Sequence, residues 1–149
     1  MSSEPRLASP GEGATVLDLV RRAFEHYVPR IGSRPRPMDE DYGEFARRGE
    51  LWVLGDPIAA ALVLQDADDH LWLDVVAVEP SHQGAGLGGK LLRFAEEEAT
   101  RRGHSEVRLL THELMSENRA IYGEIGYEEY DRRGEPGDSL VFLRKRLGG

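Results

Sequence analysis

The sequence predicts a single α/β domain built around a mixed β-sheet. Its 149 residues have the usual size of one domain, and 40% of them are hydrophobic, which is enough for a core. The run at 71–78 is too apolar for a strand with one wet face, so we expect a central strand there. Periodicity and turn residues predict the order helix, helix, three strands, helix, strand, helix, two strands, which is typical of an α/β fold.

The first half of the chain is expected to contain two helices and a hairpin. Apolar residues recur at helical spacing over 14–28 and again over 39–48. Between them, 29–37 (PRIGSRPRP) carries three prolines and a glycine, which predicts a loop. The segments 51–54 and 58–65 are predicted to be two strands joined by a tight turn.

The second half alternates between helix and strand patterns. The central strand is expected to end at Glu79 and Pro80, because proline has no amide for a central ladder. The later elements are predicted as a helix over 86–102, a strand over 106–111, a helix over 116–125, and strands over 127–132 and 139–145.

Composition excludes several classes of function. The net charge of −8 argues against a nucleic-acid or anionic-membrane partner and is compatible with a cationic acceptor such as an amine. The absence of cysteine excludes disulfides, thiolate metal sites and a cysteine nucleophile. Five scattered histidines without H-E-x-x-H spacing argue against a zinc site, so no metal is expected. Without a long apolar span or a signal-peptide pattern, we expect a cytoplasmic protein.

A glycine-dense loop, Gln83 to Lys90, follows the central strand and predicts an anion site at the start of the next helix. Three phosphate motifs overlap in it. Gly84-x-Gly86-x-x-Gly89 matches the dinucleotide fingerprint, but five residues separate it from the strand end, where that fingerprint needs its first glycine. The first seven positions of a P-loop are also present, but the Ser/Thr that would hold magnesium is Leu91.

The third motif is Gln-x-x-Gly-x-Gly, formed by Gln83, Gly86 and Gly88. It resembles the pyrophosphate loop of the GCN5-related N-acetyltransferase (GNAT) superfamily, which binds acetyl-coenzyme A. A second segment, Asn118 to Tyr122 followed by Gly126-Tyr127, is similar to the family's N-x-A-x-x-Y…G-[FY] segment. The resemblance covers residues 50–146. It implies a mostly antiparallel twisted sheet, flanked by about four helices, whose central parallel strands splay apart.

The resemblance implies a site for acetyl-coenzyme A as co-substrate. Val76 and Val78 would pair with the pantetheine arm through their main chains. Asn118 would hydrogen-bond the pantetheine or hold the loop, although it could simply cap its helix. The pyrophosphate would be cradled by the backbone amides of Gln83, Gly84, Ala85, Gly86, Gly88 and Gly89.

For catalysis, Tyr122 matches the family's general acid, since a phenol with a pKa of about 10 can protonate the departing thiolate. Asp74 is a candidate general base and, by strand alternation, is expected on the same side as Val76 and Val78. A main-chain amide near Val76 could polarise the carbonyl. The alternative bases are Glu79, Glu113, His112 and a chain of water molecules. Because the chain has no cysteine, direct transfer in a ternary complex is preferred.

The family places its acceptor pocket between the first-helix region and the strands beyond the thiol of the cofactor. The candidate acceptor residues are Tyr27, Arg30, Arg34, Met38 and Tyr42. The arginines of 29–37 could bind a carboxylate on the acceptor or could only solvate an exposed loop.

We therefore interpret the chain as an N-acetyltransferase that moves an acetyl group from acetyl-coenzyme A to a primary amine of a small molecule or peptide. A different acyl donor or acceptor on the same fold is one alternative. The other is a non-catalytic acyl-coenzyme A sensor or regulatory module, although the presence of both Tyr122 and Asp74 weighs against it. Homodimers are common among such domains.

Overall fold

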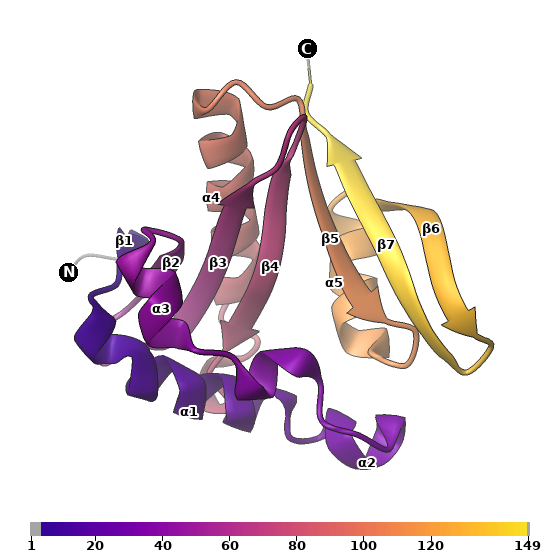
Figure 1. Ribbon diagram of the computed structural model, residues 1–149, viewed down its shortest axis with the longest axis horizontal. Coiled ribbons are helices and arrows are strands. Elements are labelled where there is room, and N and C mark those ends of the chain that lie inside the picture. The colour runs from indigo at the N-terminus through magenta and orange to yellow at the C-terminus, as the bar shows by residue number, and fades with distance from the viewer. Residues whose placement is uncertain (1–3, 149) are drawn as a thin grey trace.

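Seven strands form one sheet in the computed structural model, which describes residues 4–148 (Figure 1). Their order across the sheet is β1-β2-β3-β4-β5-β7-β6. Neighbouring strands are antiparallel, except that β4 and β5 are parallel. The strands are β1 (Arg6–Leu7), β2 (Leu51–Leu54), β3 (Ala60–Asp66), β4 (Leu71–Val78), β5 (Glu106–His112), β6 (Glu128–Glu135) and β7 (Asp138–Arg146).

Helices cover both faces of the sheet. The α-helices are α1 (Gly13–Phe24), α2 (Tyr27–Ile31), α3 (Tyr42–Arg47), α4 (Leu87–Arg101) and α5 (Ser116–Glu124). Three short 3-10 helices are η1 (Pro10–Glu12), η2 (Arg36–Asp39) and η3 (Pro80–His82). Helices α1 and α3 bury one apolar cluster against the first half of the sheet. A second cluster lies on the opposite face, beneath α4 and α5 (Figure 1).

The central strands β4 and β5 separate soon after they meet. They pair only at Leu71 with Val107 and at Trp72 with Arg108. Beyond these pairs the strands diverge, and the sheet opens into a wedge between its two halves (Figure 1). The mixed, mostly antiparallel sheet with splayed central strands is the architecture predicted above, and that prediction is confirmed.

The sequence prediction was wrong in one region. The first helix ends at Phe24, and residues predicted as its end and as loop form the separate helix α2. Pro29 lies in the first turn of α2, where a missing amide breaks no intrahelical bond. Gly32 ends that helix in a left-handed conformation with φ of 90°. Within residues 4–148, no helix combines the length and apolar character needed to cross a membrane.

Candidate functional site

Strand β4 carries a β-bulge at Asp74. Val63 on β3 pairs with Val75, but the next residue of β3, Leu64, pairs with Leu73. Asp74 is therefore the extra residue of β4, and the side-chain alternation of the strand is interrupted there. The bulge lies where β4 leaves β5, next to the wedge.

The bulge places Asp74 and Val76 on opposite faces of the sheet. Val76 and Val78 pack with the cluster under α4, whereas Val75 packs with the cluster under α1. Asp74 forms an ion pair with Arg36 of η2, on the α1 side, at 3.0 Å. The expectation that Asp74 shares a side with Val76 and Val78 is wrong, because strict alternation requires an uninterrupted ladder.

The glycine-dense loop turns tightly from β4 into α4. Gly84 and Gly86 have φ of 91° and 83°, in the left-handed region that favours glycine. The side chain of Gln83 donates to the carbonyl of Val78 at 3.3 Å and ties the loop back to the strand. Gly86 is the N-cap of α4 and has no side chain to satisfy the first amides of the helix.

Some loop amides remain free for a ligand, and two do not. The amides of Gln83 and Ala85 donate to Pro80 and His82 within the loop's own turns, each at 3.3 Å. The first-turn amides of α4 (Leu87, Gly88 and Gly89) have no intrahelical acceptor, and the helix dipole adds positive potential there. A Cβ built at Gly88 would meet only a methyl of Val78, at 3.7 Å. Protein packing therefore does not require a glycine at that position, and the space above it is open to a ligand.

Unpaired backbone groups of β4 face the wedge. The amide of Glu79 donates to Ala59 of the segment leading into β3, at 2.8 Å. By alternation along an antiparallel ladder, the backbone groups of Val76 and Val78 point away from β3 and into the gap toward β5. Strand β4 thus has a free edge to which an extended ligand could add as a strand.

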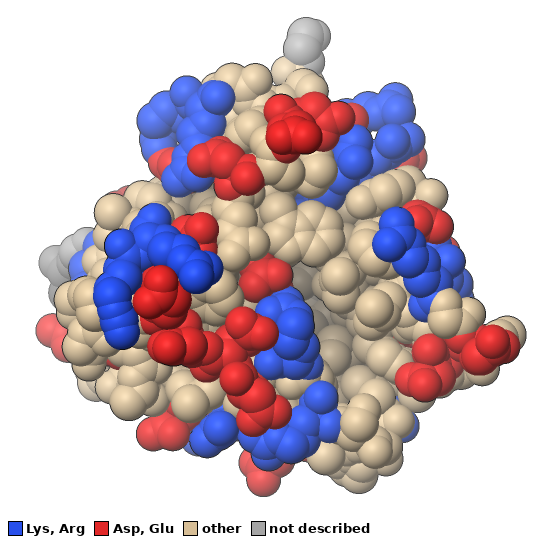
Figure 2. All heavy atoms as spheres, in the orientation of Figure 1, with Lys and Arg blue, Asp and Glu red and all other residues tan. Residues whose placement is uncertain are grey.

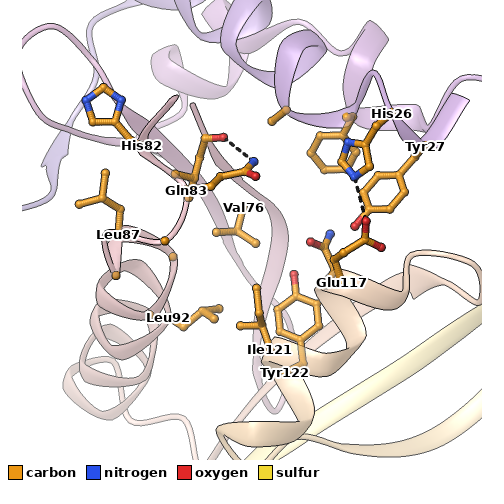
Figure 3. A pocket seen from close by; sticks show the side chains of 18 residues that line it. His26, Tyr27, Val76, His82, Gln83, Leu87, Leu92, Glu117, Ile121 and Tyr122 are labelled. Atoms are coloured by element: carbon orange, nitrogen blue, oxygen red, sulfur yellow. Dashed lines mark hydrogen bonds and ion pairs between the residues drawn. The ribbon is translucent and has the colours of Figure 1, made fainter. Parts of the chain in front are cut away.

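A cavity of about 450 Å³ connects this edge to the loop (Figure 3). Its walls come from β4, the glycine loop, the start of α4, the end of α1, and α5. Residues from all three cofactor predictions line it: Val76 and Val78, the loop glycines, and Asn118. The structure brings them together around one space of a size typical for ligands.

Tyr122 lies at the inner end of this cavity and is 5% exposed. Burial raises the pKa of its phenol well above the ordinary value of 10, and the nearby Tyr27 adds to that rise. The hydroxyl therefore stays protonated at neutral pH. In Figure 3 it points into the space between Val76 and Glu117.

A second cavity, of about 480 Å³, occupies the wedge between β4 and β5. It shares Val76, Asn118 and Tyr122 with the first cavity and adds Asp74 and Arg36. In the orientation of Figure 1, the molecule is hollowed at its centre (Figure 2). Charged side chains gather on one side of the hollow, and mostly uncharged ones form the other side. Tyr122 thus lies where two cavities meet.

Asp74 is held by two donors inside the second cavity. Its Oδ1 accepts from Arg36 at 3.0 Å and from the indole of Trp72 at 3.1 Å. Among residues 4–148, the carboxylate accepts one further hydrogen bond, a long one of 3.4 Å from Arg36 to Oδ2. Oδ1 accepts two hydrogen bonds and Oδ2 only the long one, so Oδ2 has the spare capacity to accept a further hydrogen bond, for example from an ammonium group. The side chain is 11% exposed and can be reached from the cavity.

The alternative bases are each engaged elsewhere. The Arg22 guanidinium, 2.6 Å from Glu79, lowers the pKa of that carboxyl. A hydrogen bond from the hydroxyl of Ser139 lowers the pKa of Glu113. His112 lines the second cavity, but its Nδ1 accepts from the amide of Leu114, so its Nε2 donates to Asp138. Glu79 and Glu113 do not line the second cavity, and both ring nitrogens of His112 are engaged. Asp74, by contrast, lines that cavity with an oxygen, Oδ2, that accepts only a long hydrogen bond.

The predicted acceptor residues separate into two groups. Tyr27 lines the first cavity, and Arg34 lines the second. Met38 and Tyr42 are 3% and 1% exposed, belong to the core under α1, and line neither cavity. The hydroxyl of Tyr42 donates to the carbonyl of Pro37 at 2.6 Å. Met38 and Tyr42 are therefore structural residues that support η2, which corrects the expectation that they contact the acceptor.

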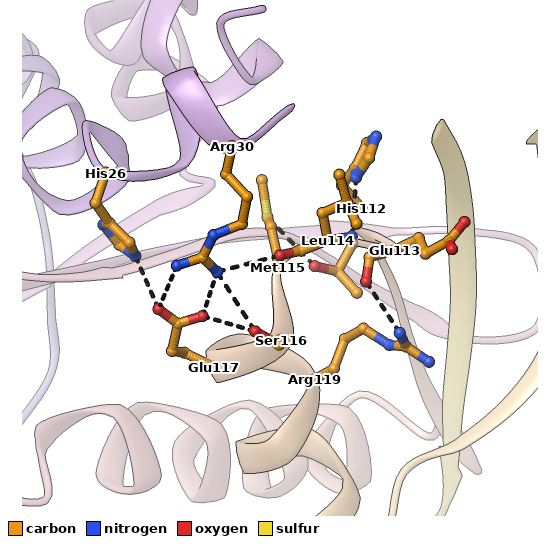
Figure 4. Close-up of polar contacts among 10 residues, drawn as sticks. His26, Arg30, His112, Glu113, Leu114, Met115, Ser116, Glu117 and Arg119 are labelled. Atoms are coloured by element: carbon orange, nitrogen blue, oxygen red, sulfur yellow. Dashed lines mark hydrogen bonds and ion pairs between the residues drawn. The ribbon is translucent and has the colours of Figure 1, made fainter. Parts of the chain in front are cut away.

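Arg30 joins α2 to α5 rather than facing the second cavity (Figure 4). Its guanidinium binds the carboxylate of Glu117 at 2.5 and 3.1 Å, and His26 lies 3.5 Å from the same carboxylate. The hydrogen bond from Arg30 lowers the pKa of Glu117 to about 2. Burial, with a further contribution from the Glu117 carboxylate, raises the pKa of the neighbouring Tyr27 to about 12.

Three further residues of the site, Arg36, Trp72 and Glu117, have no motif that marks them in the sequence. The contacts of Arg36 and Trp72 with Asp74 depend on the bulge and on the path of the proline-rich loop, and Glu117 depends on the approach of α2 to α5. The clustering of arginines with prolines in 29–37 is the available signal for Arg36. Within residues 4–148, no group of three or more His, Asp or Glu side chains is arranged to hold a metal ion.

Comparison with solved structures identifies the same fold in acetyltransferases. The PaiA N-acetyltransferase of Thermoplasma acidophilum, solved with coenzyme A, superposes with a TM-score of 0.81 at 19% identity, covering 99% of this chain and 100% of that one. The ribosomal-protein-S18-alanine N-acetyltransferase of Escherichia coli gives 0.77 at 19% identity, covering 99% and 96%. The yncA protein of Salmonella typhimurium, solved with its cofactor acetyl-CoA, gives 0.72 at 18% identity, covering 100% and 96%.

Sequence comparison identifies the family itself. No curated protein matches this chain. The profile of the acetyltransferase (GNAT) domain, however, matches residues 47–129, which is more than half of the chain. The match includes the bulged strand β4, the glycine-dense loop, α4 and the α5 segment with Asn118 and Tyr122. The chain therefore belongs to the GNAT acetyltransferase family.

Proposed function

We propose that this protein transfers an acetyl group from acetyl-coenzyme A to a primary amine of a small molecule or peptide, by direct attack in a ternary complex. The observation that carries this proposal is the position of Tyr122. Its side chain lines both the cavity of the glycine loop and the cavity of Asp74. A donor in one cavity and an acceptor in the other would meet beside its hydroxyl.

The first cavity has the donor set that acetyl-coenzyme A requires. The free amides at the start of α4 would bind the pyrophosphate, since a helix N-terminus favours anions. The free edge of β4 at Val76 and Val78 would pair with the amides of the pantetheine arm. The open space at Gly88 leaves room for phosphate oxygens close to the backbone. PaiA and yncA, which share the fold, were solved with coenzyme A and acetyl-CoA.

When bound, acetyl-coenzyme A supplies an activated thioester. The reaction forms a C–N bond and breaks the C–S bond. An acceptor that binds as an ammonium group must lose two protons, one before its nitrogen attacks and one from the tetrahedral intermediate. The thiolate gains one proton, and the other is released to solvent. Asp74 would take the first of these protons from the acceptor ammonium through its Oδ2, which accepts only a long hydrogen bond from Arg36. An amide on the free edge of β4 near Val76 would polarise the carbonyl.

Tyr122 would return a proton to the sulfur. Burial raises the pKa of the phenol and so weakens it as an acid. The same buried surroundings would also destabilise the thiolate and raise the pKa of its thiol, so the pKa values of the phenol and the thiol would stay comparable. The raised pKa has a further benefit, because the phenol carries its proton at any physiological pH.

Calorimetric titration of acetyl-coenzyme A into the purified protein tests the first half of this proposal, with NAD and ATP as controls. Micromolar binding of acetyl-coenzyme A alone supports the assignment of the loop. Binding of NAD or ATP instead, or of none, contradicts it. A second assay follows thiol release with a panel of primary amines. Binding without turnover would favour the acyl-coenzyme A sensor over the transferase.

A further inference from the structure

We propose that the acceptor is an apolar primary monoamine, such as an arylalkylamine, that carries neither a carboxylate nor a second ammonium group. This inference rests on the proposed function and specifies the substrate class of the second cavity. It follows from three properties of that cavity: its apolar walls, its carboxylate and the state of the arginines around it.

The walls of the second cavity are mainly aliphatic. Strands β4, β5 and β7, the end of α2 and the segment before α5 all contribute apolar side chains. Among them are Ile31, Val75, Leu109, Leu110, Met115 and Leu140. Leu140 is 41% exposed, so part of its apolar surface is available to a ligand in this cavity. An acceptor with an apolar body would remove this surface from water.

The carboxylate of Asp74 can pair with a single ammonium group of the acceptor. Within residues 4–148, Asp74 is the only carboxylate that lines this cavity. A single ammonium group can therefore be paired at its Oδ2, beside Tyr122. A second ammonium on the same acceptor would lie against aliphatic walls without a counter-charge, which is costly. A polyamine does not fit this arrangement.

The arginines near the cavity are already neutralised by carboxylates of the protein. Arg34 binds Asp39 through two hydrogen bonds, at 2.9 and 3.1 Å. Arg36 lies between Asp74 and Glu40, at 3.0 Å from each, so these three groups together keep one net negative charge for an acceptor ammonium. A carboxylate on the acceptor would have to displace one of these intramolecular partners, which are held at high effective concentration. An amino acid therefore does not fit either, although the sequence alone leaves a carboxylate-binding role for these arginines open.

The cavity also favours a small molecule over a peptide. Its volume of about 480 Å³ lies in the range of small-molecule pockets, and the paired side chains of Arg34 and Arg36 line it on the η2 side. A peptide N-terminus would have to bring its following residues into this limited volume, against mainly aliphatic walls.

A panel of matched amines tests the proposal in the presence of acetyl-coenzyme A. 2-Phenylethylamine is the apolar monoamine, L-phenylalanine adds a carboxylate, cadaverine carries a second ammonium, and a phenylalanyl dipeptide represents a peptide N-terminus. We expect kcat/KM for 2-phenylethylamine to exceed each of the others by about tenfold or more. A preference for phenylalanine, cadaverine or the dipeptide would overturn the inference while leaving acetyl transfer to amines in place.

A designed change of specificity provides a second test. Leu140→Glu places a second carboxylate in the cavity wall at a partly exposed position of β7. The ratio of kcat/KM for cadaverine to that for 2-phenylethylamine should rise by about fivefold or more, because the second ammonium gains a partner. Leu7→Glu is the matched control, since Leu7 is 50% exposed on β1 and lines neither cavity. An equal ratio in both variants would contradict the assignment of the cavity.

A binding experiment distinguishes failure of the proposed acetyl transfer from failure of the inferred acceptor class. If no amine is acetylated, the same four compounds are titrated calorimetrically into the protein loaded with coenzyme A. Tightest binding of 2-phenylethylamine would still support the acceptor class, although transfer itself would be disproved. Tighter binding of a charged analogue, or no binding of any amine, would overturn the inference.

Discussion

Asp74 and Val76 lie two positions apart on β4, yet their side chains occupy opposite faces of the sheet. The bulge at Asp74 shifts the pairing with β3, so that Val75 and Asp74 both lie on the α1 side while Val76 lies under α4. One strand therefore contributes to two sites. Its carboxylate faces the second cavity, where we propose that the acceptor binds, and its free edge beyond the bulge faces the first cavity, where we propose that acetyl-coenzyme A binds.

Asp74→Asn tests the acceptor half of this arrangement. The amide side chain would keep an oxygen for the indole of Trp72 but could neither take a proton nor pair with an ammonium group. We expect kcat/KM for the amine to fall by about tenfold or more, with the affinity for acetyl-coenzyme A unchanged. Steady-state kinetics and calorimetry measure the two effects.

Asp69→Asn is the matched control for that change. Asp69 is exposed just before β4 and forms an ion pair with His70. It lines neither cavity. Its replacement should leave kcat/KM unchanged. Wild-type kinetics in the Asp74 variant would exclude this carboxylate as base or ammonium partner and leave a water chain as the remaining candidate.

Tyr122→Phe removes the hydroxyl that both cavities share. The ring remains to fill the core, so we expect turnover at neutral pH to fall by about tenfold or more while acetyl-coenzyme A binds as before. Tyr130→Phe, on the edge strand β6 and in neither cavity, should change neither quantity. Unchanged turnover in the Tyr122 variant would refute the general-acid assignment.

The pH profile offers an independent check on the same residue. An acid must be protonated to act, and burial raises the pKa of Tyr122 well above 10. Loss of this proton should therefore cause no decline in kcat on the alkaline side up to about pH 10. A decline near pH 8 that disappears in Tyr122→Phe would show that the phenol titrates far below the value expected from its burial.

Much of this site could be predicted from the sequence because its signals are local. The apolar run that forms β4 and the glycine spacing at the start of α4 each depend on neighbouring residues alone. The motif with Asn118 and Tyr122 likewise lies within one short helix, α5. Local patterns also predicted the order of the elements from β2 onward. The splayed central strands were implied by the family resemblance.

The remaining features depend on contacts between distant segments. The bulge that turns Asp74 toward η2 arises from the register between β3 and β4, which no periodicity within 71–78 reveals. The pairing of Arg36 with Asp74 spans 38 positions of the chain. Met38 and Tyr42 were predicted to contact the acceptor, but the packing of η2 and α3 against α1 buries them in the core.

Gly88→Leu is expected to weaken the binding of acetyl-coenzyme A without destabilising the fold. Gly88 lies in the first turn of α4 with an ordinary helical φ, and a Cβ there has room. Leucine is a better helix former than glycine by up to about 1 kcal/mol, so thermal stability should rise slightly or stay level. Affinity for acetyl-coenzyme A should fall by about tenfold or more, because the side chain would occupy the space above the free amides.

Gly123→Leu is the control for the helix effect. Gly123 lies in α5, where a Cβ would have no neighbour within 4 Å, and it lines neither cavity. Its replacement should affect thermal stability as little as the replacement of Gly88 does, and it should leave the affinity for acetyl-coenzyme A unchanged. Equal affinity for acetyl-coenzyme A in the two variants would show that the start of α4 is not the pyrophosphate site.

The ion pair between Arg30 and Glu117 predicts a specific pH dependence of stability. The hydrogen bond from Arg30 lowers the pKa of Glu117 to about 2, against an ordinary value of 4.5. A carboxyl with a lowered folded-state pKa stabilises the fold fully above its unfolded value and loses that contribution as the pH falls toward the folded value. The contact between α2 and α5 should therefore persist at pH 5 and weaken only below about pH 4.5.

Glu117→Gln tests this dependence, because the amide cannot titrate. The difference in urea midpoint between wild type and variant should be constant from about pH 7 to pH 5 and should shrink between about pH 4.5 and pH 3. Its size should be small, since both side chains are substantially exposed and the pair is screened by solvent. Arg30→Gln should reproduce the same profile, as the two residues act through one contact. A difference that already changes between pH 7 and pH 5 would mean that another group, such as the adjacent His26, controls the link between α2 and α5.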